Sequence, residues 1–130
     1  MNSKNIFIGN NVNISDDVTL GFNVVIMDNV SIGKGCVIGN NVVIYEGSEI
    51  GEFVRIDDNT VIGKKPMKAA NSAVTKDQDL QPPKIGNNCI IGSSCVIYRG
   101  CVISHKVLVA DLSTIRENVI IGESTIVGRG

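Results

Sequence analysis

Large aliphatic residues recur at every sixth position along most of this 130-residue chain. The series begins at Ile8 and continues without a slip to Ile62, and a second series runs from Ile85 to Val127. An amphipathic helix would place apolar residues three and four positions apart, and a half-buried strand would place them at every second position. A period of six fits neither pattern, so we expect neither ordinary amphipathic helices nor a two-faced sheet.

A second position, four residues after each large aliphatic, holds small or apolar side chains. Its occupants are Val12, Val18, Val24, Val30, Cys36, Val42, Ser48, Val54, Thr60, Cys89, Cys95, Cys101, Val107, Ser113, Val119 and Thr125. Each six-residue unit therefore predicts a short strand followed by a corner. Such units bury little by themselves, so we expect coils that stack about 4.8 Å apart and share one core.

The predicted corners have a regular composition. All fourteen glycines lie one or three residues after a large aliphatic, and the later of these two positions otherwise favours Asn or Asp, as at Asn11 and Asp17. Gly, Asn and Asp tolerate the positive φ of tight turns. A glycine-rich flexible linker would scatter its glycines, so the pattern favours an ordered coil.

These repeats resemble a known family. Ile8-Gly9-Asn10-Asn11-Val12-Asn13 and Ile85-Gly86-Asn87-Asn88-Cys89-Ile90 are similar to the hexapeptide-repeat signature of left-handed parallel β-helix acyltransferases, and the resemblance covers nearly the whole chain. It implies an all-β fold, a left-handed parallel β-helix of about six coils in one domain over residues 1–130, with one extruded loop at about residues 63–84. It also implies a three-sided prism assembled as a homotrimer.

The four cysteines, Cys36, Cys89, Cys95 and Cys101, all occupy the small inward position. The last three should lie on three sides of one coil, which disfavours a disulfide, and their spacing is that of the repeat rather than of a zinc-ligand pair. The γ-type carbonic anhydrases share this fold but need several histidines, whereas this chain has only His105. We therefore expect no metal.

The extruded segment between Ile62 and Ile85 contains all three prolines and two carboxylates, Asp77 and Asp79. Its five lysines are Lys64, Lys65, Lys68, Lys76 and Lys84. In the acyltransferases that the chain resembles, such a loop typically overhangs the cleft between subunits where donor and acceptor meet. Lysines attract the phosphates of coenzyme A or of a nucleotide-sugar. Lys64, Lys65 and Lys84 are the expected contacts, and a merely solvated loop is the alternative.

Two corners depart from the Gly-X-Asn pattern, Ser104-His105-Lys106 and Ala110-Asp111-Leu112, and such departures often mark function. His105 should lie near the base of the loop, and histidine suits general-base catalysis near neutral pH. Val102-Ile103-Ser104-His105 also resembles the turn that carries the catalytic histidine in sugar and sialic-acid acetyltransferases. A surface histidine and a substrate that acts as its own base are the alternatives. Asp111 is expected to orient His105 or to bind the amino group of the acceptor.

Three further segments, 82–86, 96–100 and 113–118, resemble sugar acyltransferases of this superfamily that act on nucleotide-linked amino sugars. Within them, Arg99 precedes Glu117 by one coil, and we expect the two to form an ion pair. Tyr45 and Tyr98 should share that corner, where they would either stack on a nucleobase or pack between subunits.

Net charge and hydropathy argue against two classes of partner, nucleic acids and membranes. The net charge of −1 argues against a nucleic-acid-binding surface or a polybasic membrane anchor. No apolar run approaches the roughly 18 residues of a membrane span, so we expect a cytoplasmic protein. The expected function is acetyl transfer from acetyl-CoA to an amine of a nucleotide-linked amino sugar. The alternatives are O-acetylation of a sugar or serine hydroxyl, and a truncated, non-enzymatic trimeric scaffold.

Overall fold

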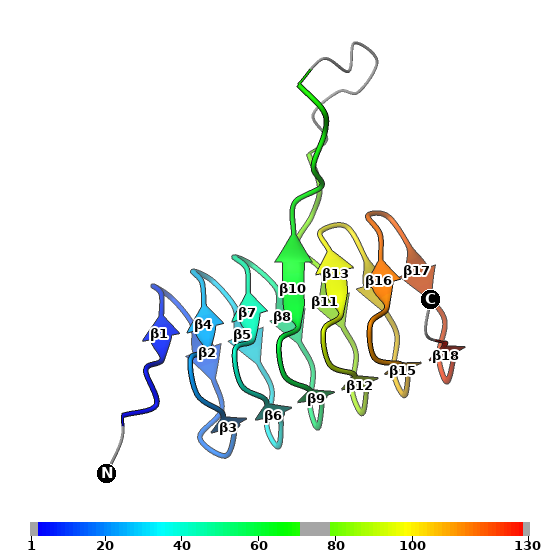
Figure 1. The fold of residues 1–130 in the computed structure, drawn as a ribbon. Helices are drawn as coiled ribbons and strands as arrows, with labels where there is room; N and C mark the ends of the chain where they lie inside the picture. The colour runs from blue at the N-terminus through cyan, green and yellow to red at the C-terminus, as the bar shows by residue number, and fades with distance from the viewer. Residues whose placement is uncertain (1–2, 71–78, 129–130) are drawn as a thin grey trace.

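The computed structural model describes residues 3–70 and 79–128, and it winds the chain into six stacked coils (Figure 1). Each coil contributes one short strand to each of three parallel sheets, and the described residues contain no helix. The predicted all-β parallel β-helix of about six coils is therefore confirmed. Lys76 and Asp77 of the predicted loop lie outside the described residues.

The three sheets form the three sides of the prism. Sheet A contains β1 (Phe7–Ile8), β4 (Val25–Ile26), β7 (Val43–Ile44), β10 (Val61–Lys64), β13 (Val96–Tyr98) and β16 (Thr114–Ile115). Sheet B contains β2 (Asn13–Ile14), β5 (Ser31–Ile32), β8 (Glu49–Ile50), β11 (Lys84–Ile85), β14 (Val102–Ile103) and β17 (Ile120–Ile121). Sheet C contains β3 (Thr19–Leu20), β6 (Val37–Ile38), β9 (Arg55–Ile56), β12 (Ile90–Ile91), β15 (Leu108–Val109) and β18 (Ile126–Val127). We name the corners A–B, B–C and C–A after the sheets they join.

The register explains the sequence period. Equivalent residues of successive coils are 18 positions apart, and 35 apart where the insertion intervenes. The repeated aliphatic residues point inward, and those of the middle coils, such as Ile44, Ile62 and Ile97, are fully buried. The second position closes the same core with side chains such as Val42 and Cys95. One aliphatic and one small residue per strand therefore fill the interior of the prism.

The corners use the backbone conformation that their composition predicts. Most Asn residues three positions after a large aliphatic have a positive φ, and Gly35, Gly47 and Gly100 replace Asn where φ is also positive. On the C–A corner, the side-chain amides of Asn5, Asn23, Asn41 and Asn59 form a hydrogen-bonded ladder along the prism. The bulky Phe53, Lys106 and Leu112 adopt the same conformation, which is uncommon for such residues.

The insertion leaves the prism at the A–B corner, where both of its arms rise away from the coils (Figure 1). β10 continues to Lys64 and β11 begins at Lys84, so the extruded part is slightly shorter than the predicted 63–84. Gly63 begins the departure with a φ of 91°, and a Cβ there would approach Ser48 Oγ to 2.9 Å. The exit of the chain at this corner therefore requires glycine.

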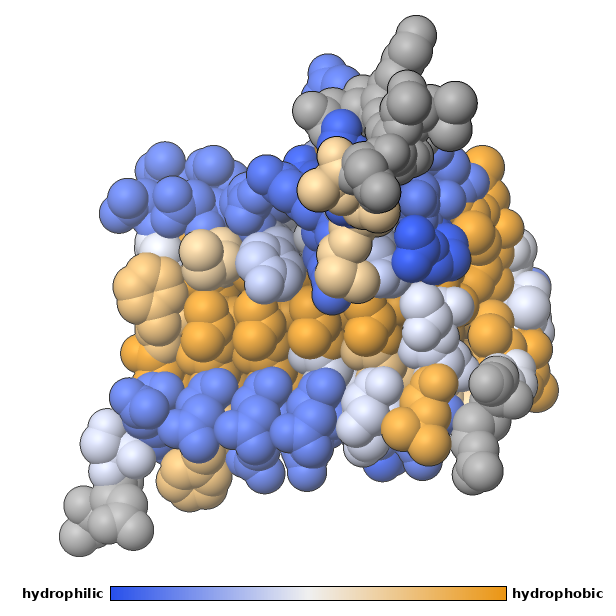
Figure 2. Space-filling model, turned by 45° about the horizontal axis from the view of Figure 1, so that its top comes forward, coloured by the Kyte–Doolittle hydropathy of each residue, from blue (hydrophilic) through white to orange (hydrophobic). Residues whose placement is uncertain are grey.

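The outer surfaces of the sheets differ. Figure 2 shows an apolar stripe between two polar rows, and it follows the outward residues of sheet A, Phe7, Val25, Val43, Val61 and Val96. Sheet B presents polar residues over its first four coils instead, ending in the paired Glu49 and Lys84. Among the described residues, no helix has the length and apolar character needed to cross a bilayer.

Candidate functional site

A groove of about 470 Å³ lies on the outer surface of sheet B and extends to the B–C corner. Its floor is formed by Glu49, Lys84 and Val102, which are aligned in register on β8, β11 and β14. Gly86, Ser104, His105 and Glu123 form its edge at the corner, together with Asn87. The groove thus brings together two residues predicted for the site, Lys84 and His105.

His105 lies one coil beyond the return of the insertion, as predicted, but at the opposite end of the sheet B strands. Its Nδ1 accepts a hydrogen bond of 2.8 Å from the backbone N–H of Asn87, and its side chain is exposed. The ring lies against Gly86, where an added Cβ would come within 2.8 Å of Nδ1. The corner therefore holds Nδ1 in a hydrogen bond, and no hydrogen bond of Nε2 is seen among the described residues at this edge of the groove.

The same hydrogen bond recurs at other corners with Asp or Asn side chains. Asp28 accepts from the N–H of Asn10, and Asp58 accepts from the N–H of Asn40. His105 thus performs the structural role of a corner Asp or Asn, and its departure from the repeat does not by itself show chemistry.

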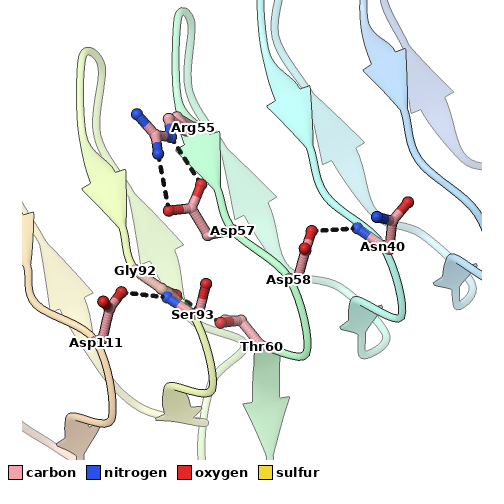
Figure 3. A network of polar contacts seen from close by, with 8 residues as sticks. All are labelled: Asn40, Arg55, Asp57, Asp58, Thr60, Gly92, Ser93 and Asp111. Carbon is pink, nitrogen blue, oxygen red and sulfur yellow. Dashed lines mark hydrogen bonds and ion pairs between the residues drawn. The ribbon is translucent and has the colours of Figure 1, made fainter.

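Asp111 does not lie beside His105. It occupies the C–A corner, at the other end of β15, where its Oδ1 accepts a 2.8 Å hydrogen bond from the N–H of Ser93 (Figure 3). The ion pair between Arg55 and Asp57 lies near this corner, with 2.7 Å between Arg55 Nε and Asp57 Oδ1 (Figure 3). The predicted use of Asp111 to orient His105 is therefore not supported by this geometry.

The lysines at the base of the insertion flank the A–B corner, Lys64 at the end of β10, Lys65 after it, and Lys84 at the start of β11. Lys65 Nζ lies 3.8 Å from Glu46 Oε1, and both side chains are largely solvated, so this contact is weak. Lys84 Nζ lies 3.9 Å from Glu49 Oε2 in a similarly exposed pair. Both lysines could therefore exchange these partners for a phosphate at little energetic cost.

Arg99 anchors the insertion instead of pairing with Glu117. Its Nη1 donates to the carbonyl of Glu46 at 3.0 Å, and its Nη2 donates to the carbonyl of Leu80 at 3.2 Å. Glu117 pairs with its neighbour Arg116 at 2.9 Å. The predicted Arg99–Glu117 ion pair is wrong, because Arg99 donates instead to a carbonyl of an earlier coil and to a carbonyl of the insertion.

Tyr98 also belongs to this base. It is buried, with 4% of its surface exposed, and the guanidinium of Arg116 lies 4.2 Å from its ring centroid. Tyr45 lies on the same corner, where its backbone N–H donates to the carbonyl of Ile62 at 2.8 Å. Tyr98 is thus a packing residue within the described chain rather than an exposed stacking surface.

All four cysteines are free and buried in the wall of the prism, as predicted. Each thiol donates to a backbone carbonyl, for example Cys89 to Ser104 at 3.0 Å and Cys95 to Ala110 at 3.1 Å. Burial raises the pKa of each thiol, and that of Cys101 reaches about 11. In residues 3–70 and 79–128, no group of three or more His, Cys, Asp or Glu side chains could hold a metal ion.

Sequence reasoning missed Glu123, Glu49 and Ser31 as groove residues. The 18-residue register places Glu123 one coil after His105, and this signal was available from the repeat. Glu49 and Ser31 could not be placed beside Lys84 until the register across the insertion was known.

Comparison with family models gives two matches. The model described as bacterial transferase hexapeptide (six repeats) matches residues 5–46, and the model described as hexapeptide repeat of succinyl-transferase matches residues 82–110. A comparison with curated proteins gave no match.

Several solved structures share the fold. The GDP-perosamine N-acetyltransferase from Caulobacter crescentus, in complex with CoA and GDP-perosamine, is 16% identical with a TM-score of 0.53, and the match covers 94% of this chain and 54% of that one. AntD, an N-acyltransferase from Bacillus cereus in complex with dTDP and 3-hydroxybutyryl-CoA, is 20% identical with a TM-score of 0.64, covering 90% of this chain and 75% of that one. A hexapeptide transferase family protein from Anaplasma phagocytophilum is 19% identical with a TM-score of 0.57, and the match covers 98% of this chain and 78% of that one. This chain spans about half the length of the Caulobacter protein.

Proposed function

Because the chain belongs to the hexapeptide-repeat transferase family, we propose that it is a coenzyme A-dependent acyltransferase. The proposed reaction moves the acetyl group of acetyl-CoA to an amine of a nucleotide-linked amino sugar. Two solved structures of similar fold support the substrate class, since one contains CoA with GDP-perosamine and the other contains an acyl-CoA with dTDP. Acetyl-CoA and nucleotide-sugars are cytoplasmic metabolites, so we place the protein in the cytoplasm.

The observation that carries this proposal is the groove on sheet B. It combines a cation for phosphate recognition, Lys84, with a histidine, His105, and with apolar floor residues such as Val102. A small-molecule site typically has this composition, an apolar surface with a few convergent polar groups. Asp111 is not part of the proposed site, because it lies on a different corner.

The proposal includes a homotrimer. In a closed ring of three identical copies, each copy uses two different faces, one for each neighbour. Sheets A and C carry most of the outward apolar residues, and on sheet C these are Val37, Ile90, Leu108 and Ile126. Sheet B carries the groove and would stay open to substrate. We therefore place sheet A of one copy against sheet C of the next.

This arrangement would complete the site. Packing sheet A of one copy on sheet C of its neighbour brings the A–B corner of the first beside the B–C corner of the second. The insertion with Lys64 and Lys65 would then lie next to the neighbouring copy's His105. Within a single chain these groups occupy different corners, so the trimer explains how they could act on one substrate.

Calorimetric titration with acetyl-CoA tests the activity class. The wild-type protein should bind, and Lys64→Gln with Lys65→Gln should weaken binding about tenfold for each lysine–phosphate interaction that the substitutions remove. Lys34→Gln is the matched control, since Lys34 lies over Phe53, at 5.9 Å, and does not line the groove. A folded trimer that binds no acetyl-CoA would instead support the scaffold alternative.

Analytical ultracentrifugation tests the assembly. Val43→Asp places a charge on the outward face of sheet A and should yield monomers, whereas Asn13→Asp on sheet B should leave the trimer intact. A monomeric wild-type protein, or a trimeric Val43→Asp variant, would contradict the proposed packing.

A further inference from the structure

The hydrogen bond at Nδ1 determines which ring nitrogen of His105 carries the proton. A backbone N–H can only donate, so Nδ1 must accept from Asn87 through its lone pair. In the neutral imidazole the proton then resides on Nε2. In this state His105 presents a hydrogen-bond donor, and it has no free lone pair with which to accept a proton.

Resting on the proposed acyltransferase function, we infer that His105 donates its Nε2–H to the thioester carbonyl oxygen, and that Glu123 accepts the proton of the acceptor ammonium. This assignment reverses the sequence expectation that His105 is the general base. It follows from the hydrogen bond at the corner and from the position of Glu123, which lines the same groove one coil from His105.

Two carboxylates line the groove, and they lie at different distances from His105 along sheet B. Glu49 is on β8, two strands away from β14, the strand that leads to His105, and it lies beside Lys84 at 3.9 Å. Glu123 is exposed and forms no ion pair with any residue that the structure describes. The pairing of Ile103 with Ile121 and the 3.0 Å hydrogen bond from Ser124 N to His105 O place Glu123 one coil from His105.

The reaction balances with these two roles. Glu123 takes one proton from the acceptor R–NH₃⁺, and the free amine attacks the thioester carbonyl carbon to form the C–N bond. Negative charge develops on the carbonyl oxygen and is stabilised by the Nε2–H of His105. The C–S bond then breaks, and the remaining excess proton on nitrogen passes to the sulfur of coenzyme A, giving the amide and the free thiol.

The ¹⁵N NMR spectrum of the imidazole tests the geometry without any activity. His105 is the only histidine, so the two ring nitrogens need no further assignment. At a pH where the ring is neutral, the spectrum should show a protonated Nε2 and an unprotonated Nδ1. The opposite tautomer, or rapid averaging of the two, would overturn the inference.

Two variants test the chemistry. His105→Asn retains the corner hydrogen bond, because Asn87 already accepts such a bond from Glu52 N at 2.9 Å, but it removes the Nε2 donor. It should keep the wild-type melting temperature and lower kcat by about 10²–10³-fold at every pH. Glu123→Gln should lower kcat by about 10²-fold at neutral pH and recover as rising pH deprotonates the acceptor amine.

The pH profiles separate this inference from its rivals. Recovery of His105→Asn at high pH, with an unaffected Glu123→Gln, would make His105 the base and overturn the assignment. Full activity of both variants would also overturn it. A wild-type protein that neither binds nor turns over acetyl-CoA would instead refute the proposed function, and the NMR result would still report on the tautomer.

Discussion

The corners that carry His105 and Asp111 are built in the same way but border different surfaces. Each side chain accepts a 2.8 Å hydrogen bond from a backbone N–H of the preceding coil, and each lies against a glycine. His105 lines the groove on sheet B, whereas Asp111 does not line it. A departure from the repeat is thus explained first by the fold, and the surface that the side chain faces decides whether it also has a chemical role.

The largest expected difference between the corners is catalytic. In acetyl transfer, His105→Asn should lower kcat by about 100-fold or more, whereas Asp111→Asn should leave it unchanged. Both substitutions keep a corner oxygen that can accept the backbone N–H. Steady-state kinetics with acetyl-CoA, compared at equal melting temperature, provide the measurement. An equal decrease in both variants would remove the distinction between the two corners.

The glycines beneath the corners should respond alike to a methyl group. A Cβ at Gly86 would lie 2.8 Å from His105 N, and one at Gly92 would lie 2.7 Å from Asp111 N. Backbone must shift in both cases, so Gly86→Ala and Gly92→Ala should each lower the free energy of unfolding by about 1–3 kcal/mol. Gly122→Ala is the control, because the nearest atom there is Thr125 Oγ1 at 3.9 Å. Denaturant unfolding that ranks Gly122→Ala with the others would contradict this account.

Removal of the corner acceptor should have a smaller effect, equal at the two corners. His105→Ala and Asp111→Ala each leave a backbone N–H to solvent, and each should lower the free energy of unfolding by about 1 kcal/mol. The Asn variants should restore this stability, as thermal unfolding would show. If His105→Ala lowered the free energy of unfolding by more than this and His105→Asn did not restore it, packing of the imidazole ring would contribute in addition to its hydrogen bond.

The smallest expected difference concerns the thiols under the corners. Burial raises the pKa of Cys89 and of Cys95, and the charge of Asp111 further raises the pKa of Cys95 only. The pKa of each thiol is higher in the folded state than its ordinary value of 9.0, so above pH 9.0 the thiols lose protons when the protein unfolds. The free energy of unfolding is therefore unaffected by these thiols below pH 9.0 and declines above it. Asp111→Asn should reduce this alkaline decline by a few tenths of a kcal/mol, and His105→Asn should not. Unfolding curves between pH 8 and about 10.5 would test this.

The coils could be predicted from the sequence, because one inward aliphatic residue per strand leaves a six-residue period that neither a helix nor a half-buried strand produces. The corners followed from Asn and Gly at fixed positions, and the insertion followed from the missed repeat between Ile62 and Ile85. The inward placement of Cys89 and Cys95 followed for the same reason.

The contacts of the site were harder to predict. His105 and Asp111 are six residues apart, a spacing that places them on different corners, so their shared departure from the repeat does not make them parts of one site. Arg99 donates to the carbonyls of Glu46 and Leu80, and the position of the Leu80 carbonyl depends on the path of the insertion, which has no repeat. Side-chain direction within a corner carries no periodic signal, and this limits what the repeat can show.

The central claim is that acetyl-CoA reacts at the groove beside His105. The most direct measurement is the ¹⁵N spectrum of this single imidazole during titration with acetyl-CoA, using Asp111→Asn as a control protein. The account predicts that the Nε2 signal shifts on binding in both proteins while Nδ1 keeps its bond to Asn87. Saturable binding that leaves both ring signals unchanged would place the donor elsewhere and contradict the account.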